Sequence, residues 1–553
     1  MTSSLSSPKA DKRVAELIAR FSAPDACAAY LLCDGHPPGA TAYTVVASDL
    51  SARKLTFGEL KAQSEKFAAG LKSLGVGPGD RVATLMGKSV EFLVALLGIW
   101  RLGAVHVPLF TAFAPPAIAF RLNGSAAKVV VCDDTQRPKL AAGDDIPANP
   151  PWRVICLNTT SAPASDAIDF ADFVAKQPTG LPAAKLGGNA PMIQIYTSGT
   201  TGRPKGVIAP IKALASFQIY AEFGQGVVAD DVFWCAADPG WAYGLFLGIL
   251  CALTTGAHGI LVQGGFDAKL TYDVMAKFGV TNFAAAPTVY RSLRVSDVPA
   301  PKGLKLRRLS SAGEPLTPEV NQWTEQTFGL LVHDHYGQTE TAMTVNNHHD
   351  PELQRPLRTG SMGHAMPGWT ALVLKMNEDK EAATDEVGRL AFDLTKSPLM
   401  WFTGYVDEPT KSAEKFSKVG PWYVTGDTAR VDKDGYVHFS ARDDDVIIMA
   451  GYRIGPFEVE SVIATHPSVN ECAVIAAPDA TRGEVLESYV VLKSGVAGSP
   501  DVVEDIQQWV KTKYAAHAYP RSVHFVDSLP KTPSGKIQRF VLRQQRRDEL
   551  AKG

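Results

Sequence analysis

Apolar helical stretches alternate with short β-branched runs over the first four-fifths of the chain. Residues 89–102, SVEFLVALLGIWRL, predict a largely buried helix, and residues 104–109, AVHVPL, predict the strand that follows it. Similar β-rich runs at 127–132, 153–157 and 281–285 predict further strands. Because this alternation is typical of a mainly parallel sheet covered by helices, we expect an α/β fold.

Two changes in amino-acid composition indicate how the chain is divided. Residues 158–189 are rich in Ala, Pro, Ser, Asp and Gly and predict a surface connection. A charged run from Arg442 to Asp445 precedes a segment of ordinary domain size. There, strand-like runs at 473–476 and 488–492 and a helix near 502–513 predict a small α+β domain. We therefore expect a large N-terminal domain of mixed or parallel sheets, residues 1–443, and a small C-terminal domain, residues 444–553.

Composition narrows the class of protein. Hydrophobic residues make up 45% and charged residues 20%, and the formal net charge is -2, so we expect neither nucleic acid nor a membrane surface as partner. Residues 241–262 lack charged side chains, but interrupting Gly and Thr predict a buried helix and strand rather than a membrane span. Seven cysteines without a CxxC pair, and no secretory signal, predict a cytoplasmic location.

The segment richest in chemistry is 196–207, YTSGTTGRPKGV, which follows a strand-like run. Four hydroxyl side chains alternate with Gly199 and Gly202, and Lys205 closes the segment. Glycines let backbone N–H groups turn toward an anion, and hydroxyls and a lysine add donors, so the pattern predicts a phosphate-binding loop. It is not a Walker A loop, because Gly206 follows Lys205 where that motif requires Ser or Thr.

This loop and the later strings SAGEP (311–315), YGQTE (336–340), TGD (425–427), GYRIGPFEVE (451–460) and KTPSGKIQR (531–539) resemble, in order, the motifs of the adenylate-forming superfamily. That superfamily includes acyl-CoA synthetases, luciferases and peptide-synthetase adenylation domains. GYVDEPTKSA from Gly404 and PDATRGEV from Pro478 resemble the medium-chain acyl-CoA synthetases within it. Two departures, Ala441 for a glycine and Ala450 for a serine, remove no charged catalytic group.

The resemblance implies an ATP site. Tyr336 would stack on adenine, Asp427 would accept hydrogen bonds from both ribose hydroxyls, and Glu340 would hold Mg²⁺, which prefers carboxylate and phosphate oxygens. The resemblance also implies catalytic roles for Lys536, Thr197, Glu340 and Thr339. The ATP or AMP would be contacted by Thr197, Ser198, Gly199, Thr200, Thr201, Gly202, Lys205, Gly313, Glu314, Pro315, Asp334, His335, Tyr336, Gly337, Gln338, Thr339, Asp427, Arg442, Arg453 and Lys536.

The implied reaction has two halves. The carboxylate first attacks the α-phosphate of ATP, and Lys536, a compact cation on a flexible stem, suits bridging the two groups. The small domain would then rotate about a hinge at Asp444 and bring a second face to the site for transfer to coenzyme A. Coenzyme A would be contacted by Gly451, Tyr452, Arg482, Lys511 and Tyr519. The histidines at 333, 335, 348 and 349 lack a zinc motif, and we assign no zinc.

The acyl pocket is predicted from Gly337 and Trp241. Acetyl-CoA synthetases carry a tryptophan at the position of Gly337, so its absence predicts room for short- to medium-chain fatty acids, with Trp241 as another wall. An aryl acid of the benzoate type, or acetate and propionate, remain alternatives. So do an adenylating enzyme that uses no coenzyme A and an inactive nucleotide-binding relative.

We expect Lys536→Ala to nearly abolish adenylate formation, because the variant lacks the ammonium group that would bridge the carboxylate and the α-phosphate. Thioester formation from chemically made acyl-adenylate and coenzyme A should be largely intact. Each half-reaction is measured separately, by pyrophosphate release and by acyl-CoA formation. Equal losses in the two halves would contradict the role given to Lys536.

Overall fold

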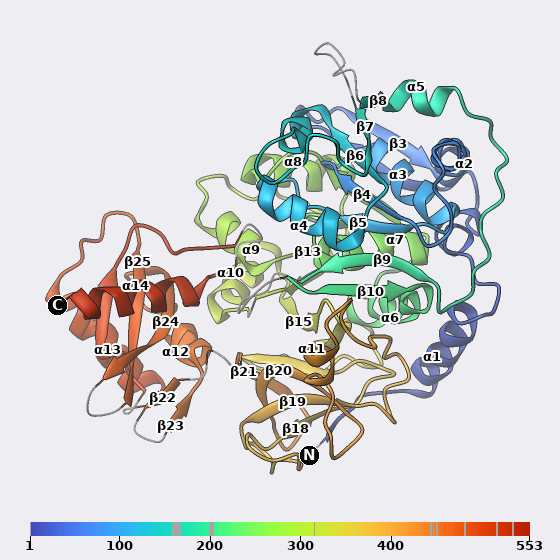
Figure 1. The fold of residues 1–553 in the computed structure, drawn as a ribbon. Coiled ribbons are helices and arrows are strands. Elements are labelled where there is room, and N and C mark those ends of the chain that lie inside the picture. The colour runs from blue at the N-terminus through green and yellow to red at the C-terminus, as the bar shows by residue number, and fades with distance from the viewer. Residues whose placement is uncertain are drawn as a thin grey trace.

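A computed structural model describes residues 2–157, 167–197, 204–314, 316–442, 445, 447–449, 452–479, 483–515, 518–532 and 536–552. The side chains at 448, 452, 453, 483, 551 and 552 are not included. The chain forms a large mixed α/β body with a smaller C-terminal body beside it (Figure 1). This arrangement confirms the predicted fold class.

A seven-stranded sheet forms the first layer of the large body. Its central strands are parallel, and the predicted strands at 104–109, 127–132 and 153–157 all lie in it. In spatial order, its members are β10 (Gly206–Pro210), β9 (Pro191–Tyr196), β5 (Val105–Pro108), β4 (Arg81–Leu85), β6 (Val129–Asp133), β7 (Arg153–Leu157) and β8 (Ala167–Asp169).

A fourteen-stranded sheet changes character at its middle. One half is mainly parallel and contains β15 (Val332–Gln338), β14 (Arg308–Ala312), β13 (Asn282–Ala285), β11 (Val232–Cys235), β12 (His258–Val262), β2 (Thr41–Val46) and the antiparallel β3 (Ala52–Thr56). The other half is antiparallel and contains β16 (Ala342–Asn346), β17 (Ser361–Ala365), β21 (Val437–Arg442), β20 (Trp422–Val431), β19 (Gly388–Asp393), β18 (Ala371–Leu374) and β1 (Thr2–Ser3).

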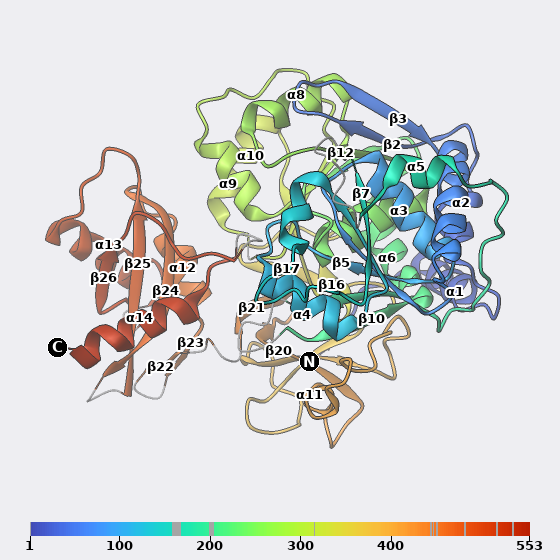
Figure 2. The ribbon, with the colours of Figure 1, turned by 45° about the horizontal axis from the view of Figure 1, so that its top comes forward.

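Helices cover both faces of the parallel half. Side chains of β11, β13, β14 and β15 pack on one face against α8 (Ala268–Phe278), α9 (Pro287–Val295) and α10 (Pro318–Phe328). These three helices lie together in Figure 2. The opposite face packs against α6 (Leu214–Ile219), η4 (Tyr220–Gly224), η5 (Tyr243–Ile249) and α7 (Leu250–Thr255). The remaining elements of the large body are α1 (Pro8–Phe21), η1 (Tyr30–Asp34), α2 (Phe57–Ser73), α3 (Val90–Arg101), α4 (Pro115–Ser125), η2 (Asp134–Leu140), α5 (Phe170–Ala175), η3 (Ile211–Ala213) and α11 (Pro409–Ala413).

Helix α3 shows how the sequence specifies a central element. Ser89 precedes the first turn, and its hydroxyl accepts a hydrogen bond from the amide of Phe92 at 3.0 Å, as an N-cap residue does. Apart from Glu91, every residue of the helix is buried. A helix that is apolar on all sides belongs inside a layered core, which confirms the predicted buried helix at 89–102.

The smaller body is a five-stranded sheet with helices against it (Figure 2). It confirms the predicted strands at 473–476 and 488–492 and the helix near 502–513. Its elements are β22 (Ile447–Met449), β23 (Tyr452–Ile454), α12 (Pro456–Ile463), β24 (Val469–Asp479), β25 (Gly483–Leu492), α13 (Pro500–Lys513), β26 (Ser522–Phe525) and α14 (Arg539–Lys552).

Two segments were only partly anticipated by the sequence. Within the predicted surface connection over 158–189, residues 167–175 form β8 and α5, two short elements that the sequence did not predict; 158–166 lie outside the described residues. The stretch 241–262 is the predicted buried helix and strand, but its first helical part, η5, is a π-helix. No helix in the described part of the chain is long and apolar enough to cross a membrane.

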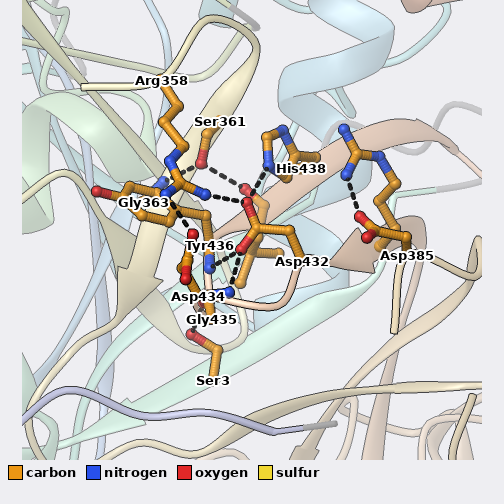
Figure 3. Close-up of polar contacts among 12 residues, drawn as sticks. Ser3, Arg358, Ser361, Gly363, Asp385, Asp432, Asp434, Gly435, Tyr436 and His438 are labelled. Carbon is orange, nitrogen blue, oxygen red and sulfur yellow. Dashed lines mark hydrogen bonds and ion pairs between the residues drawn. The ribbon is translucent and has the colours of Figure 1, made fainter. Parts of the chain in front are cut away.

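The N-terminal strand β1 adds to the edge of the large sheet beside a polar network (Figure 3). Ser3 Oγ donates to the carbonyl of Gly435 at 2.6 Å. Asp432 accepts hydrogen bonds from Arg358 at 2.6 Å, from His438 at 3.1 Å and from the amide of Tyr436 at 3.0 Å. Burial by itself raises the pKa of Asp432, but these donors outweigh it and lower that pKa to about 2.

The lowered pKa of Asp432 predicts how the stability of the fold depends on pH. Because Asp432 stays ionised in the fold below its ordinary pKa near 3.9, the carboxylate contributes roughly 2 kcal/mol to the free energy of unfolding above about pH 4. That contribution is lost as the pH falls toward 2. Asp432→Asn should lower the melting temperature at pH 7, and the difference from the unmodified protein should shrink below pH 4.

Asp434→Asn is the matched control, because Asp434 is exposed and its carboxylate bonds only Arg358 among the described side chains. It should change the melting temperature little, as exposed ion pairs usually do. Equal losses in the two variants, or a loss at Asp432 that does not depend on pH, would refute this account of the network.

Candidate active site

The predicted phosphate loop connects two paired strands. Strand β9 ends at Tyr196 and β10 begins at Gly206, and these two residues are register partners. At the base of the loop the amide of Thr197 donates to the carbonyl of Lys205 at 2.9 Å, and the amide of Lys205 donates to Thr197 Oγ1 at 3.3 Å. The predicted residues Ser198, Gly199, Thr200, Thr201 and Gly202 lie outside the described residues.

The YGQTE segment lies where the two halves of the large sheet meet. Asp334 to Gln338 belong to β15, and Thr339 and Glu340 form the turn into β16. Burial raises the pKa of Asp334 to about 8. Burial also lowers the pKa of His335 far below its ordinary value. Both groups are therefore uncharged in the fold at neutral pH.

Asp427 joins this segment to the antiparallel half of the sheet. Its carboxylate accepts a hydrogen bond from Tyr336 Oη at 2.5 Å and one from Gln338 Nε2 at 2.6 Å. Arg442 is its register partner on β21. Burial, followed by the charge of Asp427, raises the pKa of Tyr336 above its ordinary value, so the phenol stays a donor. Four residues predicted to contact the nucleotide, Tyr336, Gln338, Asp427 and Arg442, are thus brought together from distant parts of the sequence.

Glu340 has a partner that the sequence analysis missed. Tyr405 Oη donates to Glu340 Oε1 at 2.6 Å, and both residues are buried. Burial, then the charge of Glu340, raises the pKa of Tyr405, which keeps its proton on the phenol. The ammonium of Lys205 lies 4.6 Å from the centre of the Tyr405 ring, a cation–π contact. This chain of contacts connects the phosphate loop to the predicted Mg²⁺ ligand.

Lys415 is a second residue that the sequence analysis missed. Its ammonium donates to the carbonyl of Thr425 at 2.5 Å. Desolvation lowers the pKa of Lys415, while the carboxylates of Glu340 and Asp427 act to raise it. Lys415 therefore places another cation beside the two buried carboxylates. The signal was present in GYVDEPTKSAEKF, but nothing in the string shows that Lys415 points inward.

Lys536 of the smaller body lies within electrostatic reach of the same place. Desolvation lowers its pKa, and the carboxylates of Glu314, Asp427 and Glu340 oppose that shift. The residue as a whole is exposed to solvent. Glu314 is itself held by Arg291 at 2.8 Å. Its neighbour Gly313 has a φ of +96°, and Pro315 lies outside the described residues.

The predicted coenzyme A residues are only partly described. Lys511 lies with its ammonium 4.1 Å from the centre of the Tyr519 ring, and the guanidinium of Arg521 lies 4.0 Å from the same centre. Arg521 was not predicted, although it follows Tyr519 by two residues. The predicted Tyr452 and Arg453 lie in β23, without described side chains, and Gly451, Arg482 and the predicted hinge Asp444 lie outside the described residues.

The two predicted acyl-pocket residues have different surroundings. Trp241 packs against Phe110 and Phe113, with ring centres 5.5 and 5.3 Å apart. A Cβ added to Gly337 would lie 2.1 Å from the carbonyl oxygen of Ala342, closer than real Cβ atoms approach. The space beside Gly337 is therefore filled by the backbone of the next strand. A Gly337→Trp exchange would have to move that strand.

Three of the four histidines, His333, His335 and His349, make hydrogen bonds within the fold. His333 Nδ1 lies 2.9 Å from the carbonyl of Asn347, and His349 Nε2 lies 3.0 Å from that of Leu309. Throughout the residues that the structure describes, no group of three or more His, Cys, Asp or Glu side chains is placed to hold a metal ion. All seven cysteines are buried and free.

Comparison with known proteins identifies the family. The profile of the family described as AMP-binding enzyme matches residues 33–405, and the profile described as AMP-binding enzyme C-terminal domain matches residues 458–536. The chain belongs to the AMP-binding enzyme family. The resemblance found in its motifs is thereby confirmed.

Relatives within this family extend over nearly the whole chain. Acetyl-coenzyme A synthetase of Bacillus subtilis is 36% identical over 496 residues, 89% of this chain and 85% of that protein. The mitochondrial acyl-coenzyme A synthetase ACSM3 of Mus musculus is 34% identical over 501 residues, 89% of this chain and 84% of that protein. The crystal structure of an acyl-CoA synthetase from Brucella canis shares 41% identity with a TM-score of 0.74, covering 98% and 99% of the two chains.

Membership in this family indicates which reaction the charged groups at the end of β15 serve. The chain is an acyl-CoA synthetase of this family, a ligase whose substrates are ATP, a small carboxylic acid and coenzyme A. The cations and carboxylates gathered at the end of β15 are suited to holding a nucleotide, because a triphosphate needs positive charge and a ribose needs hydrogen-bond acceptors.

The position of Lys415 leads to a prediction about ATP. Lys415→Met should raise the KM for ATP about tenfold, because a cation in a site sheltered from water stabilises phosphate charge. Lys411→Met is the control, since Lys411 lies four residues earlier, is exposed and pairs with Glu414. Initial rates over a range of ATP concentrations measure both. An unchanged KM for ATP in Lys415→Met would show that Lys415 only supports the backbone at Thr425.

Proposed function

We propose that the enzyme converts a short- to medium-chain carboxylic acid, ATP and coenzyme A to acyl-CoA, AMP and pyrophosphate through an acyl-adenylate. One observation carries the proposal: Lys205, Glu340 and Asp427, which come from three distant segments, lie around the end of β15, and Lys536 is near enough for both carboxylates to oppose the lowering of its pKa. An inactive relative would have no reason to retain this set of charges in one place.

The first half-reaction needs alignment and neutralisation of charge. A carboxylate oxygen of the acid bonds the α-phosphorus, and the bond from that phosphorus to the bridging oxygen breaks, so that pyrophosphate leaves with the electron pair. No proton has to move for this exchange. Lys205, Lys415 and Lys536 would offset the phosphate charge, and Asp427 would orient the ribose, which is catalysis by positioning and electrostatics.

Glu340 fits the role of a Mg²⁺ ligand. Its carboxylate is buried and supplies the hard oxygen that Mg²⁺ prefers, and Tyr405 fixes the orientation of one oxygen. With ATP bound, the phosphates would supply the other oxygen ligands. Such an ion would contribute positive charge on the phosphates during the first half-reaction.

The second half-reaction would use a rotation of the smaller body about a hinge at Asp444, which we propose as the boundary between domains 1–443 and 444–553. Asp445, the next residue, pairs with Arg543 at 2.5 Å and with Arg539 at 3.6 Å. Both arginines lie in α14, so Asp445 already moves with the smaller body. The basic pair Lys511 and Arg521 around Tyr519 would face the phosphates of coenzyme A.

The acid is proposed from the family resemblance and from the aromatic side chains around Trp241. The family resemblance favours short- to medium-chain fatty acids, and the relative from Bacillus subtilis is named for acetate. The aromatic group of Trp241, Phe110 and Phe113 offers apolar surface to a longer chain or a ring. A cytoplasmic location stays a prediction, and the mouse relative is named as mitochondrial.

The proposal predicts how catalytic efficiency changes with the chain length of the acid. The value of kcat/KM should rise from acetate through butyrate toward hexanoate. Each buried methylene contributes at most about 0.8 kcal/mol of favourable binding free energy. It should level off or fall once the pocket is full. The assay measures pyrophosphate release with and without coenzyme A, and acyl-CoA formation when coenzyme A is present.

The same assay separates the rival functions. Pyrophosphate release with no acyl-CoA would indicate an adenylating enzyme that does not use coenzyme A. No release with any acid from acetate to decanoate or benzoate would favour an inactive relative. A preference for acetate over butyrate would contradict the proposed chain length while leaving the reaction intact.

A further inference from the structure

The part of the smaller body that carries Lys536 folds back on itself. We call residues 530–538 the Lys536 segment, of which 533–535 lie outside the described residues. Lys531 and Ile537 form an antiparallel bridge, and the amide of Lys536 donates to Thr532 Oγ1 at 3.0 Å. Ile537 packs against an apolar cluster that includes Ile475 of β24. These contacts give the backbone at Lys536 a defined position relative to β24.

An ion pair holds the Lys536 segment at each end. On one side the ammonium of Lys531 lies 2.8 Å from Glu471 Oε1 of β24. On the other side Arg539, the first residue of α14, donates from Nε to Glu460 Oε1 at 2.9 Å and from Nη2 to Glu460 Oε2 at 2.6 Å. Lys536 therefore lies between two anchors that belong to the same body.

The pair of Arg539 and Glu460 is the more tightly held of the two. Their side chains are 19% and 8% exposed, and the paired bonds fix the direction of the guanidinium as well as its distance. Glu460 lies in α12, and its Oε1 also accepts a hydrogen bond from the amide of Val474 in β24 at 2.7 Å. Burial by itself lowers the pKa of Arg539, but the charge of Glu460 outweighs it and raises that pKa, so the pair stays charged. Arg539 thus ties the start of α14 to α12 and β24.

Arg539 also contacts the chain next to the proposed hinge. Its Nη1 lies 3.6 Å from Asp445 Oδ2, and Asp445 pairs with Arg543 of α14 as well. One guanidinium therefore connects the residue after the proposed hinge with the end of the Lys536 segment. A rotation at Asp444 would carry these groups together, and the position of Lys536 would follow the rotation instead of being lost in its own loop.

We propose that Arg539 is a positioning residue for the first half-reaction. By its contacts with Glu460 and Asp445 it holds Lys536 where the ammonium can reach the carboxylate and the α-phosphate, and Lys531 supports the other end of the segment. This inference rests on the proposed function, in which Lys536 acts in the first half-reaction only. Such support matters because displacing a reacting group by about 1 Å lowers a rate up to about 100-fold.

The test measures the two half-reactions of Arg539→Gln in the same preparation. The first is the acid-dependent exchange of labelled pyrophosphate into ATP without coenzyme A. The second is acyl-CoA formation from chemically made acyl-adenylate and coenzyme A. The ratio of the two rates does not depend on how much enzyme is folded, so a loss of folded protein cannot imitate a loss of positioning.

We expect Arg539→Gln to lower the maximal rate of exchange about 100-fold, because Lys536 is no longer held in place. The KM for ATP should change less than about threefold, since residues of the large body would bind the nucleotide, and acyl-CoA formation should also change less than about threefold. Arg539→Lys, which keeps the charge and loses the paired bonds, should give a smaller loss of exchange. Lys531→Met should lower exchange about threefold to tenfold, because its side chain is 32% exposed and its ion pair is weaker.

Arg546→Gln is the matched control. Arg546 lies seven residues after Arg539 in α14 and makes the same paired contact with Glu487, from Nε at 2.7 Å and from Nη2 at 3.1 Å. The side chains of Arg546 and Glu487 are 20% and 6% exposed, close to the values for Arg539 and Glu460. The variant removes a comparable ion pair without touching the Lys536 segment. It should leave the ratio of the two rates unchanged even though the melting temperature falls.

Three results would overturn the inference. They are equal losses in both half-reactions of Arg539→Gln, a change of the ratio in Arg546→Gln as large as that in Arg539→Gln, and an unchanged ratio in both Arg539→Lys and Lys531→Met. The last two variants decide the question if Arg539→Gln does not fold. Absence of acid-dependent exchange in the unmodified enzyme would instead contradict the proposed function.

Discussion

The site depends on two buried carboxylates, Glu340 and Asp427, held where the parallel and antiparallel halves of the large sheet meet. Each accepts a short hydrogen bond from a tyrosine, Tyr405 and Tyr336 respectively. Burying a carboxylate is costly unless donors and cations surround it. The surrounding structure meets that requirement with phenols, the Gln338 amide and lysines from several segments. The same groups are those that a nucleotide needs.

The charges around these carboxylates come from both bodies of the chain. Lys205 and Lys415 belong to the large body, so in the proposed reaction their charge would stay with the nucleotide throughout. Lys536 belongs to the small body and reaches the carboxylates from outside. A cation carried on a separate body can be withdrawn after the first half-reaction. In the proposed reaction, the charge of the large body would stay in place and the charge of Lys536 would be removed.

The sequence predicted the parts of this site that lie within short motifs. The strand before the phosphate loop, the position of YGQTE at a strand end and the α/β class all follow from local pattern, and the structure confirms them. Tyr405, Lys415 and Arg521 were missed because their importance arises from contacts between distant segments. Gly337 shows a different limit. A missing side chain was interpreted as open space, whereas the backbone of Ala342 occupies it.

In the proposed reaction an acyl-adenylate forms before coenzyme A takes part. The most direct measurement is the exchange of labelled pyrophosphate into ATP, with enzyme, acid and Mg²⁺ but no coenzyme A. We expect exchange that requires the acid and proceeds without coenzyme A, because the first half-reaction is reversible and complete in itself. Exchange that appears only when coenzyme A is added, while acyl-CoA is still produced, would contradict it.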